Sequence, residues 1–380
     1  MKNLEQILSN SDSSFIYRGV DDSNIKYLSG ISLEDPFYVI RQEDETTILT
    51  RRVNKEKVQR KTSNDSVIAY EEYIDKGIRD DPRSEAQVLN ELLKDKQIQS
   101  LILPPAFPVY VADSLREDEF DISILDYDAV VQSRMIKNDE EIEYMRSIQS
   151  LTEETMMQVK KMLEKSDVNE DNELVLENEV LTSGRIKQHV TSFLNEHGAE
   201  PTEGTIVASG LQTSGVHNFG DGPIKADQPI ICDIFPRGEN GYYGDMTRTF
   251  IKGEPTDEFK NMYRSTEEAL QSALNTIEAG VLGSEVYEAA SKKIREYGYD
   301  THTEADDGFI HSLGHGIGTE VHEKPSLNKE CGVLEKNTIL TVEPGVYLDK
   351  EGGVRIEDMV RVTEDGYENL NSMDNKILFV

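Results

Sequence analysis

The chain has few cysteines, no tryptophan and no long run of apolar residues. Its 380 residues include two cysteines, Cys232 and Cys331, and neither lies in a Cys-x-x-Cys spacing. Two cysteines exclude a disulfide framework, and their spacing gives no zinc-binding motif. No segment reaches the roughly 18 apolar residues of a membrane span, and the first residues lack the apolar core of a secretory signal. We therefore expect a cytoplasmic protein that has no membrane partner.

Positive charge is also scarce. The chain has 73 Asp and Glu residues against 40 Lys and Arg residues, which gives a formal net charge of −33. A surface without a basic stripe cannot neutralise phosphate groups, so nucleic acid is not an expected partner. Such strong self-repulsion suggests a salt-rich cytoplasm, where counterions screen the charge. An ordinary solvated acidic surface is the alternative interpretation.

Five residues of the types that bind metal ions lie in the C-terminal third of the chain. They are two aspartates, one histidine and two glutamates: Asp233, Asp245, His315, Glu343 and Glu357. Each carboxylate pair brackets a glycine-containing turn with strand-like residues on both sides, which predicts two hairpins. Centred on Glu239, the first hairpin sets Asp233 opposite Asp245. Centred on Lys350, the second sets Glu343 opposite Glu357.

Carboxylates that face each other across two strands need a cation or a proton between them. Directly opposed residues have Cβ atoms about 4.5–5.5 Å apart, and two carboxylates at that separation repel. Four carboxylates and one imidazole suit two divalent ions that share bridging carboxylates. The alternative is that these are ordinary acidic residues. It explains any one of them better than the set, because an unpaired carboxylate in a central strand carries a large desolvation cost.

The pattern of apolar residues divides the chain into two domains, residues 1–130 and residues 131–380. The first alternates short strands with a helix, which predicts an α/β domain. The second begins with a long helix at Asn138, where Glu141 is placed for a capping box. Further helices are expected at residues 183–197, 256–280 and 284–298.

The second domain repeats the order helix–helix–hairpin, which predicts that both carboxylate pairs lie on one sheet around a central site. Thr256 and Ser284 are expected to cap the two helices of the second repeat. The charged tract 166–178, within the first repeat, is expected to be a surface loop.

Histidines gather around the carboxylate strands. The segment HSLGHGIGTEVHE contains His311, His315 and His322, and His217 lies in GVHNFGDG. The glycines of the first segment disfavour a helix, so it is expected to be an extended loop whose bare backbone lets histidines approach a metal or a substrate. A lone histidine is usually structural, but this clustering favours a site.

Four segments, DIFPRGENGYYGDMTRTF, HSLGHGIGTEVHE, TVEPGVY and GGVRIEDMV, resemble the Xaa-Pro aminopeptidase and prolidase group of pita-bread metallopeptidases. The resemblance covers about residues 130 to 380. Through DSNIKYLSG, residues 1–130 more weakly resemble the accessory N-terminal domain of that group. The resemblance implies an α+β protein with a C-terminal pita-bread domain and an α/β accessory domain. The two aspartates are twelve residues apart, whereas eleven is commoner in the group, and the extra residue falls in the hairpin loop.

The resemblance also implies that the five residues bind two divalent metal ions. Mn or Co are expected, and Zn or Fe are alternatives. Asp233 would bind one ion, His315 and Glu343 would bind the other, and Asp245 and Glu357 would bridge the two. Two further residues would hold these carboxylates from behind: Arg355 and Thr247.

By the same resemblance, the metals lower the pKa of a bound water, and the resulting hydroxide attacks the carbonyl before a proline nitrogen. Glu343 would carry the proton to the leaving amine. His322 would stabilise the oxyanion, and His217 and His311 would line the substrate pocket. The implied substrate is a proline-containing dipeptide or longer peptide, and the implied assembly is a homodimer.

Other functions of the same fold are alternatives. A pita-bread module that binds without catalysis typically lacks ligands, and none is missing here. Creatine amidinohydrolase-like chemistry uses the fold without metal, which the intact carboxylates disfavour. Methionine aminopeptidase-like activity is disfavoured by the ending RIED and by the extra N-terminal domain.

The net charge predicts that salt stabilises the protein. Because the Debye length falls from about 10 Å at 0.1 M to about 3 Å at 1 M salt, added KCl weakens the repulsion between surface carboxylates. We expect the thermal midpoint to rise with KCl in both metal-loaded and metal-free protein. A midpoint that stays flat or falls over this range would contradict the salt-adapted interpretation.

Overall fold

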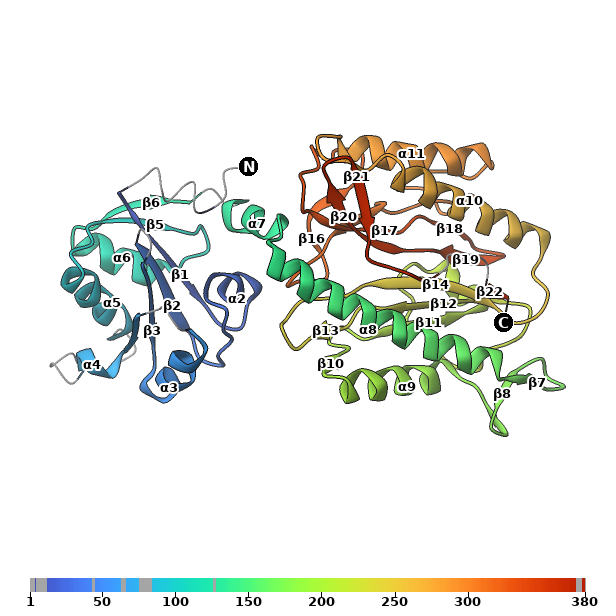
Figure 1. The fold of residues 1–380 in the computed structure, drawn as a ribbon, viewed down its shortest axis with the longest axis horizontal. Coiled ribbons are helices and arrows are strands. Elements are labelled where there is room, and N and C mark those ends of the chain that lie inside the picture. Colours follow the sequence, from blue (N-terminus) through green and yellow to red (C-terminus); the bar gives the residue numbers. More distant parts are fainter. Residues whose placement is uncertain are drawn as a thin grey trace. The chain divides into compact units, whose positions relative to one another are not determined.

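The chain forms two compact units. The computed structural model describes residues 4, 12–42, 45–62, 66–74, 84–125, 128–373 and 378–379. The units are Met1–Arg134 and Met135–Val380, and Figure 1 labels their elements. Among the described residues, no helix combines the length and the apolar character that a membrane span requires.

A six-stranded sheet forms the centre of the first unit, in the order β4-β3-β2-β1-β5-β6. Its strands are β1 (Ser14–Gly19), β2 (Phe37–Gln42), β3 (Glu45–Thr50), β4 (Ser66–Ala69), β5 (Ser100–Leu103) and β6 (Asp121–Ile124). The first three strands pair antiparallel, and β4, β5 and β6 join in parallel. The predicted α/β architecture of this region is confirmed.

Helices cover both faces of this sheet. They are α2 (Ser23–Ser29), α3 (Arg52–Lys61), α4 (Glu71–Ile74), α5 (Ser84–Asp95) and α6 (Val109–Glu117), and α7 (Asp128–Met135) follows. Because successive strand residues point to opposite faces, Phe15 packs with residues of α2 and α3, whereas Ile16 packs with residues of α5 and α6.

The second unit contains two main sheets. One has the order β11-β12-β14-β22 and the other β16-β15-β17-β20-β21. The strands of the first are β11 (Thr205–Ser209), β12 (Pro229–Ile234), β14 (Met246–Ile251) and β22 (Leu378–Phe379). Those of the second are β15 (Gly314–Gly316), β16 (Glu323–Leu327), β17 (Ile339–Val342), β20 (Asp358–Thr363) and β21 (Gly366–Asn369).

Two helix pairs enclose these sheets (Figure 1). The pairs are α8 (Asp139–Glu164) with α9 (Ser183–Glu196), and α10 (Asp257–Leu274) with α11 (Gly283–Glu296). Residues of α8 and α9 share an apolar core with β11, β12 and β14. Residues of α10 and α11 share another with β17 and β20. The carboxylate hairpins therefore lie between two layers of helices, but the prediction that both belong to one sheet is wrong.

Local signals predicted some helix boundaries well. Asn138 caps α8, and its capping box with Glu141 is present. Thr256 caps α10 through the backbone N–H of Phe259. Ser284, in contrast, lies inside the first turn of α11, because the preceding Leu282 pairs with Val333 and this bridge sets the entry to the helix.

Two other expectations about this region are wrong. Helix α10 ends at Leu274 rather than near Gly280, because the chain beyond it bonds to other segments: the N–H of Gly280 donates to the carbonyl of Leu334. The tract 166–178 is not a loop. It contributes to a three-stranded sheet of β7 (Asp167–Val168), β8 (Leu174–Leu176) and β9 (Glu179–Val180).

The two carboxylate hairpins differ in how well their register was predicted. Strand β17 pairs with β20 so that Val342 faces Asp358, and β18 (Gly345–Leu348) pairs with β19 (Gly352–Arg355) so that Gly345 faces Arg355. Both registers are centred on Lys350, as predicted.

In the first hairpin Asp233 faces Thr247, not Asp245, so the predicted centre at Glu239 is wrong. The hairpin instead turns about Asn240: Arg237 pairs with Tyr243, and the N–H of Gly238 donates to the carbonyl of Tyr242. Its tip contains β13 (Arg237–Gly238), which also pairs with β10 (Ala199–Glu200).

Candidate metal centre

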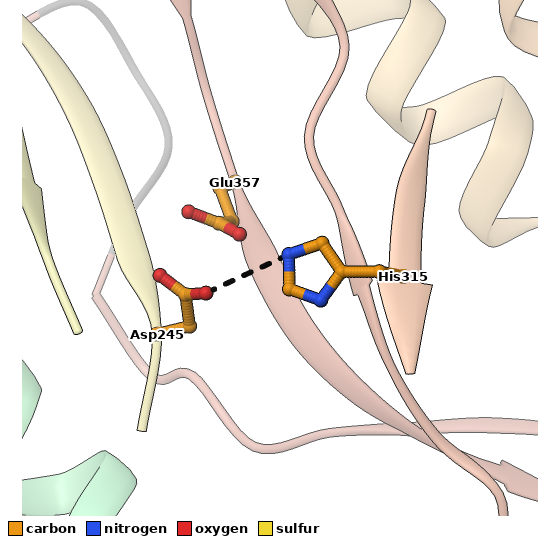
Figure 2. Close-up of side chains that lie close together, drawn as sticks. All are labelled: Asp245, His315 and Glu357. Carbon is orange, nitrogen blue, oxygen red and sulfur yellow. Dashed lines mark ion pairs between the residues drawn. The ribbon is translucent and has the colours of Figure 1, made fainter. Parts of the chain in front are cut away.

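Three ligand candidates converge between the two sheets of the second unit. Asp245, His315 and Glu357 each offer one atom, and these atoms all lie within 4.8 Å of one another. Figure 2 shows the three side chains pointing at a common point. Asp245 directly precedes β14, Glu357 directly precedes β20, and His315 is the central residue of β15. Side chains from the two sheets thus meet where the inner strands β14 and β20 begin.

The other two candidates border this group. The Nε2 atom of His315 lies 3.4 Å from Oε1 of Glu343 and 3.8 Å from Oδ2 of Asp245. Asp233 lies in β12, is 9% exposed, and accepts a hydrogen bond of 2.7 Å from Nη2 of Arg355. The structure therefore brings all five predicted ligand positions to one place.

Burial and mutual repulsion disfavour the charged carboxylates. Burial raises the pKa of Glu343 to about 8, and Asp233 adds to the shift. Burial also raises the pKa of Asp245 well above its usual value, with further contributions from Glu357, Asp233 and Glu343. The pKa of Glu357 is raised for the same reasons. Without a cation, this group cannot carry its full charge at neutral pH.

The residues fit divalent metal ions by two further observations. Oδ1 of Asp233 is buried and has no hydrogen-bond partner, which leaves a donor atom for an ion. Nδ1 of His315 donates to the carbonyl of Gly316 at 3.0 Å, which leaves the Nε2 lone pair facing the carboxylates. Burial lowers the pKa of His315 to about 4, so the ring is neutral, as a metal ligand must be.

Arg355 connects several parts of the centre. Besides Asp233, its guanidinium donates to Oγ1 of Thr247 at 3.2 Å and to the hydroxyl of Tyr347 at 2.9 Å. Thr247 in turn donates to Oε2 of Glu357 at 2.8 Å. One buried cation thus contacts Asp233 directly and Glu357 through a threonine.

Sequence reasoning missed three residues that hold the centre together. Tyr347 links Arg355 to Nε2 of His311 at 3.1 Å. Gln149 in α8 forms two hydrogen bonds with the backbone of Asp245. Thr341 accepts from the N–H of His315 and donates to Glu343 at 3.3 Å. The sequence could have indicated Thr341, because it lies two residues before the predicted ligand Glu343 in the same hairpin arm. No feature of the sequence indicated Gln149.

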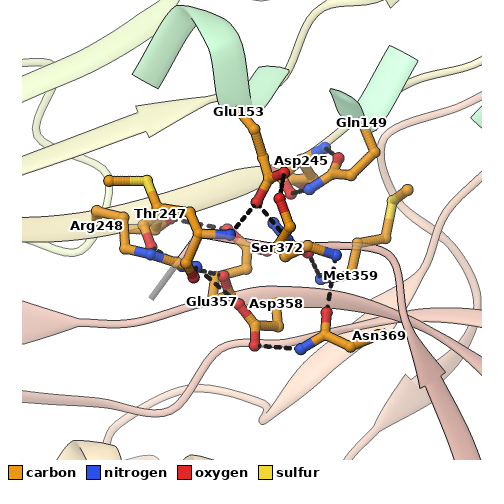
Figure 3. A network of polar contacts seen from close by, with 12 residues as sticks. Gln149, Glu153, Asp245, Thr247, Arg248, Glu357, Asp358, Met359, Asn369 and Ser372 are labelled. Carbon is orange, nitrogen blue, oxygen red and sulfur yellow. Dashed lines mark hydrogen bonds and ion pairs between the residues drawn. The ribbon is translucent and has the colours of Figure 1, made fainter. Parts of the chain in front are cut away.

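A second polar layer lies behind the carboxylates (Figure 3). Arg248 and Asp358 form an ion pair of 2.9 Å in which both side chains are 1% exposed. Each directly follows a residue of the centre, Thr247 and Glu357 respectively. Asn369 also donates to Asp358 at 2.8 Å. The pair therefore ties β14 to β20 immediately behind the carboxylates.

The histidines occupy different positions around the centre. His322 is exposed, and its ring centroid lies 4.4 Å from that of His315. His311 is half-buried against Tyr347, and its pKa is lowered to about 3 by burial and by Arg355. His217 is exposed in the loop after the 3-10 helix η1 (Gly210–Ser214).

Comparison with known proteins identifies related families. Residues 143–364 match Metallopeptidase family M24, and residues 2–136 match the Creatinase/Prolidase N-terminal domain. The chain is 29% identical over 375 residues to Xaa-Pro dipeptidase from Pyrococcus furiosus, covering 97% of this chain and 95% of that protein.

Solved structures agree with these matches. The X-Pro aminopeptidase from Thermotoga maritima is 26% identical, with a TM-score of 0.80 over 99% of both chains. The prolidase from Pyrococcus furiosus is 25% identical, with a TM-score of 0.77 over 98% of this chain and 100% of that one. The predicted resemblance and the predicted α+β pita-bread fold with an N-terminal accessory domain are confirmed.

The raised pKa values predict how metal-free protein responds to pH. Glu343 has a pKa of about 8 against a usual 4.5, so the folded protein keeps a proton that the unfolded chain releases in this window. The stabilisation from that proton is complete below the lower value and is lost as pH rises through the upper one. The thermal midpoint of chelated protein should therefore fall relative to metal-loaded protein as pH rises from about 5 to about 8. A gap independent of pH would contradict this expectation.

Proposed function

The chain belongs to metallopeptidase family M24, and on that premise we propose that it is a dinuclear metal-dependent exopeptidase. Its substrate is a peptide with proline in the second position, and the scissile bond precedes that proline. The observation that carries the proposal is the group of four carboxylates and one neutral imidazole, in which every residue is buried except the half-buried Glu343. The names of the relatives, Xaa-Pro dipeptidase and X-Pro aminopeptidase, support the choice of substrate.

We assign the ligands as the resemblance implies. Asp233 would hold one ion, His315 and Glu343 would hold the other, and Asp245 and Glu357 would be shared between them. When bound, two divalent ions lower the pKa of a water molecule and polarise the peptide carbonyl. The oxygen-rich set favours Mn or Co, and Zn or Fe are alternatives.

Other side chains serve proton transfer and binding. Glu343 is half-buried, and Thr341 orients its carboxylate, so it is placed to take a proton from the attacking water and pass it to the leaving amine. His322 is exposed beside His315, where its ring can donate to the oxyanion of the transition state. His311, fixed by Tyr347, and the exposed His217 would line the substrate pocket.

The remaining assignments stay predictions. We propose that residues 1–130 act as an accessory domain and that residues 131–380 carry catalysis, which the family match of residues 2–136 supports. A cytoplasmic location and a homodimer are expected from the sequence. A non-catalytic binding module is disfavoured because no ligand position is missing. Methionine aminopeptidase-like activity is disfavoured by the accessory domain.

Peptide hydrolysis after controlled metal loading tests the function. Chelated protein should be inactive, and Mn or Co should restore cleavage of Xaa-Pro substrates but not of the matched Xaa-Ala peptides. A dipeptide and an Xaa-Pro-Yaa tripeptide assayed side by side would separate dipeptidase from aminopeptidase activity. Full turnover by demonstrably metal-free protein would rule out the two-metal mechanism.

The proposed role of His322 predicts a loss of turnover without a loss of metal. His322→Ala should lower kcat by about 10²–10³, the usual effect of removing one oxyanion donor. Metal content should stay near that of the wild type. His302→Ala is a matched control, because His302 is exposed, contacts Asp300 and is not among the assigned ligands. Metal loss in proportion to activity would instead make His322 a ligand.

A further inference from the structure

A buried ion pair that is not part of the metal centre joins Lys137 to Glu323. The Nζ atom lies 3.0 Å from Oε2, and the two side chains are 1% and 3% exposed. The desolvation cost of a buried pair often cancels its Coulombic gain, so such a pair is weak evidence for stability. In some proteins a buried ion pair instead favours one conformation of the chain over others. The contacts around Lys137 and Glu323 indicate which segment they would hold in one conformation.

The carboxylate of Glu323 organises the loop that connects β15 to β16. Its Oε1 atom accepts from the N–H of Thr319 at 2.9 Å, from the N–H of Glu320 at 3.2 Å and from the hydroxyl of Thr319 at 3.2 Å. A Cβ atom at Gly318 would lie 2.7 Å from the same carboxylate, so a larger residue there would displace it. The loop therefore folds around Glu323.

This loop carries His322, the residue directly before Glu323. His315 lies in β15, just before the loop, and the two imidazole rings meet edge to face at 4.4 Å between centroids. His322 is itself exposed, so little packing holds its side chain in place. The position of its backbone thus depends on the hydrogen bonds and the ion pair of the next residue.

The backbone of Lys137, the other residue of the pair, is held by hydrogen bonds. The N–H of Lys137 donates to the carbonyl of Asn337 at 3.0 Å, and Ile136 pairs with Thr338. Asn138 then caps α8. The backbone of Lys137 is therefore fixed between the residues before β17 and the start of α8. This fixes the point from which its side chain extends toward Glu323.

The same segment also contacts the hairpin that carries Asp245. Glu141, in the first turn of α8, accepts from the hydroxyl of Tyr242 at 2.7 Å. The N–H of Tyr243 donates to the carbonyl of Gly318 at 2.8 Å, which joins this hairpin to the loop of His322. Residues 136–141 thus brace two of the segments that surround the centre.

We propose that Lys137 and Glu323 are positioning residues for His322. Their ion pair selects the loop conformation in which His322 stands beside His315, while neither residue touches the substrate. The catalytic consequence rests on the proposed function. The positioning itself does not, because it can be measured without turnover.

Three variants separate charge pairing from loop hydrogen bonding. Lys137→Met leaves the carboxylate of Glu323 buried without its cation. Glu323→Gln keeps an oxygen that can accept from Thr319 and Glu320 but removes the charge. The double variant removes both charges and leaves the loop acceptor in place. Val190→Ala in α9 is the control for lost stability, because Val190 lies in the core formed by α8, α9 and the sheet of β11, β12 and β14.

Two readouts are compared, the first in zinc-loaded protein and the second in manganese-loaded protein. In spectra of isotopically labelled histidine, with His322→Ala to assign the signal, the His322 resonance should move in each single variant and return toward its wild-type position in the double variant. In parallel, kcat on an Xaa-Pro peptide should fall by up to about 10² in the single variants, the order of loss for a displaced catalytic group. KM and metal content should stay unchanged, and Val190→Ala should leave the resonance in place.

Several outcomes would overturn the proposal. They are an unmoved His322 resonance in both single variants, a kcat that falls only with the folded fraction or with bound metal, and additive losses in the double variant. If a single variant does not fold, Thr319→Val removes one hydrogen bond to Glu323 and should move the resonance in part. A wild-type protein that cleaves no Xaa-Pro peptide would refute the proposed function alone, because the resonance test would still stand.

Discussion

The repulsion among four carboxylates in one buried space is the constraint on which the second unit depends. Three of them have raised pKa values, and the fourth, Asp233, leaves one oxygen without a hydrogen-bond partner. No packing of apolar side chains relieves such a cost, but divalent cations do. The fold therefore holds the four carboxylates close together in spite of their repulsion, in an arrangement that divalent cations would stabilise.

Buried positive charge completes that frame. Arg355 bonds Asp233 and, through Thr247, reaches Glu357, while Arg248 pairs with Asp358 immediately behind. Each arginine joins strands of different sheets, so the position of one carboxylate is coupled to that of another. Such neighbours orient the ligands, and their mutation typically costs about 10–100-fold in metal affinity or activity.

The proposed catalytic groups divide into rigid and loosely held ones. Glu343 and His311 are fixed by Thr341 and Tyr347, which suits proton transfer and substrate contact at defined positions. His322 is exposed, so its location depends on the loop around Glu323 and on Lys137. Glu343 and His311 are held by neighbouring residues of the centre. His322, in contrast, is positioned through Lys137, the residue before the cap of α8. Changes far from the substrate can therefore act on one step of the reaction.

The sequence by itself determined the features that depend on local spacing. The capping box of Asn138 and the register about Lys350 follow from residues a few positions apart, and the resemblance that implied the ligand set was carried by short segments. Tertiary structure decided the rest. Asp233 faces Thr247 because the hairpin turns about Asn240 rather than Glu239, and its tip also pairs with the distant β10. The contacts of Arg355 with Asp233 and of Lys137 with Glu323 join residues 122 and 186 positions apart. Such contacts form only when separate elements pack together, because burial turns distant charges into obligatory partners.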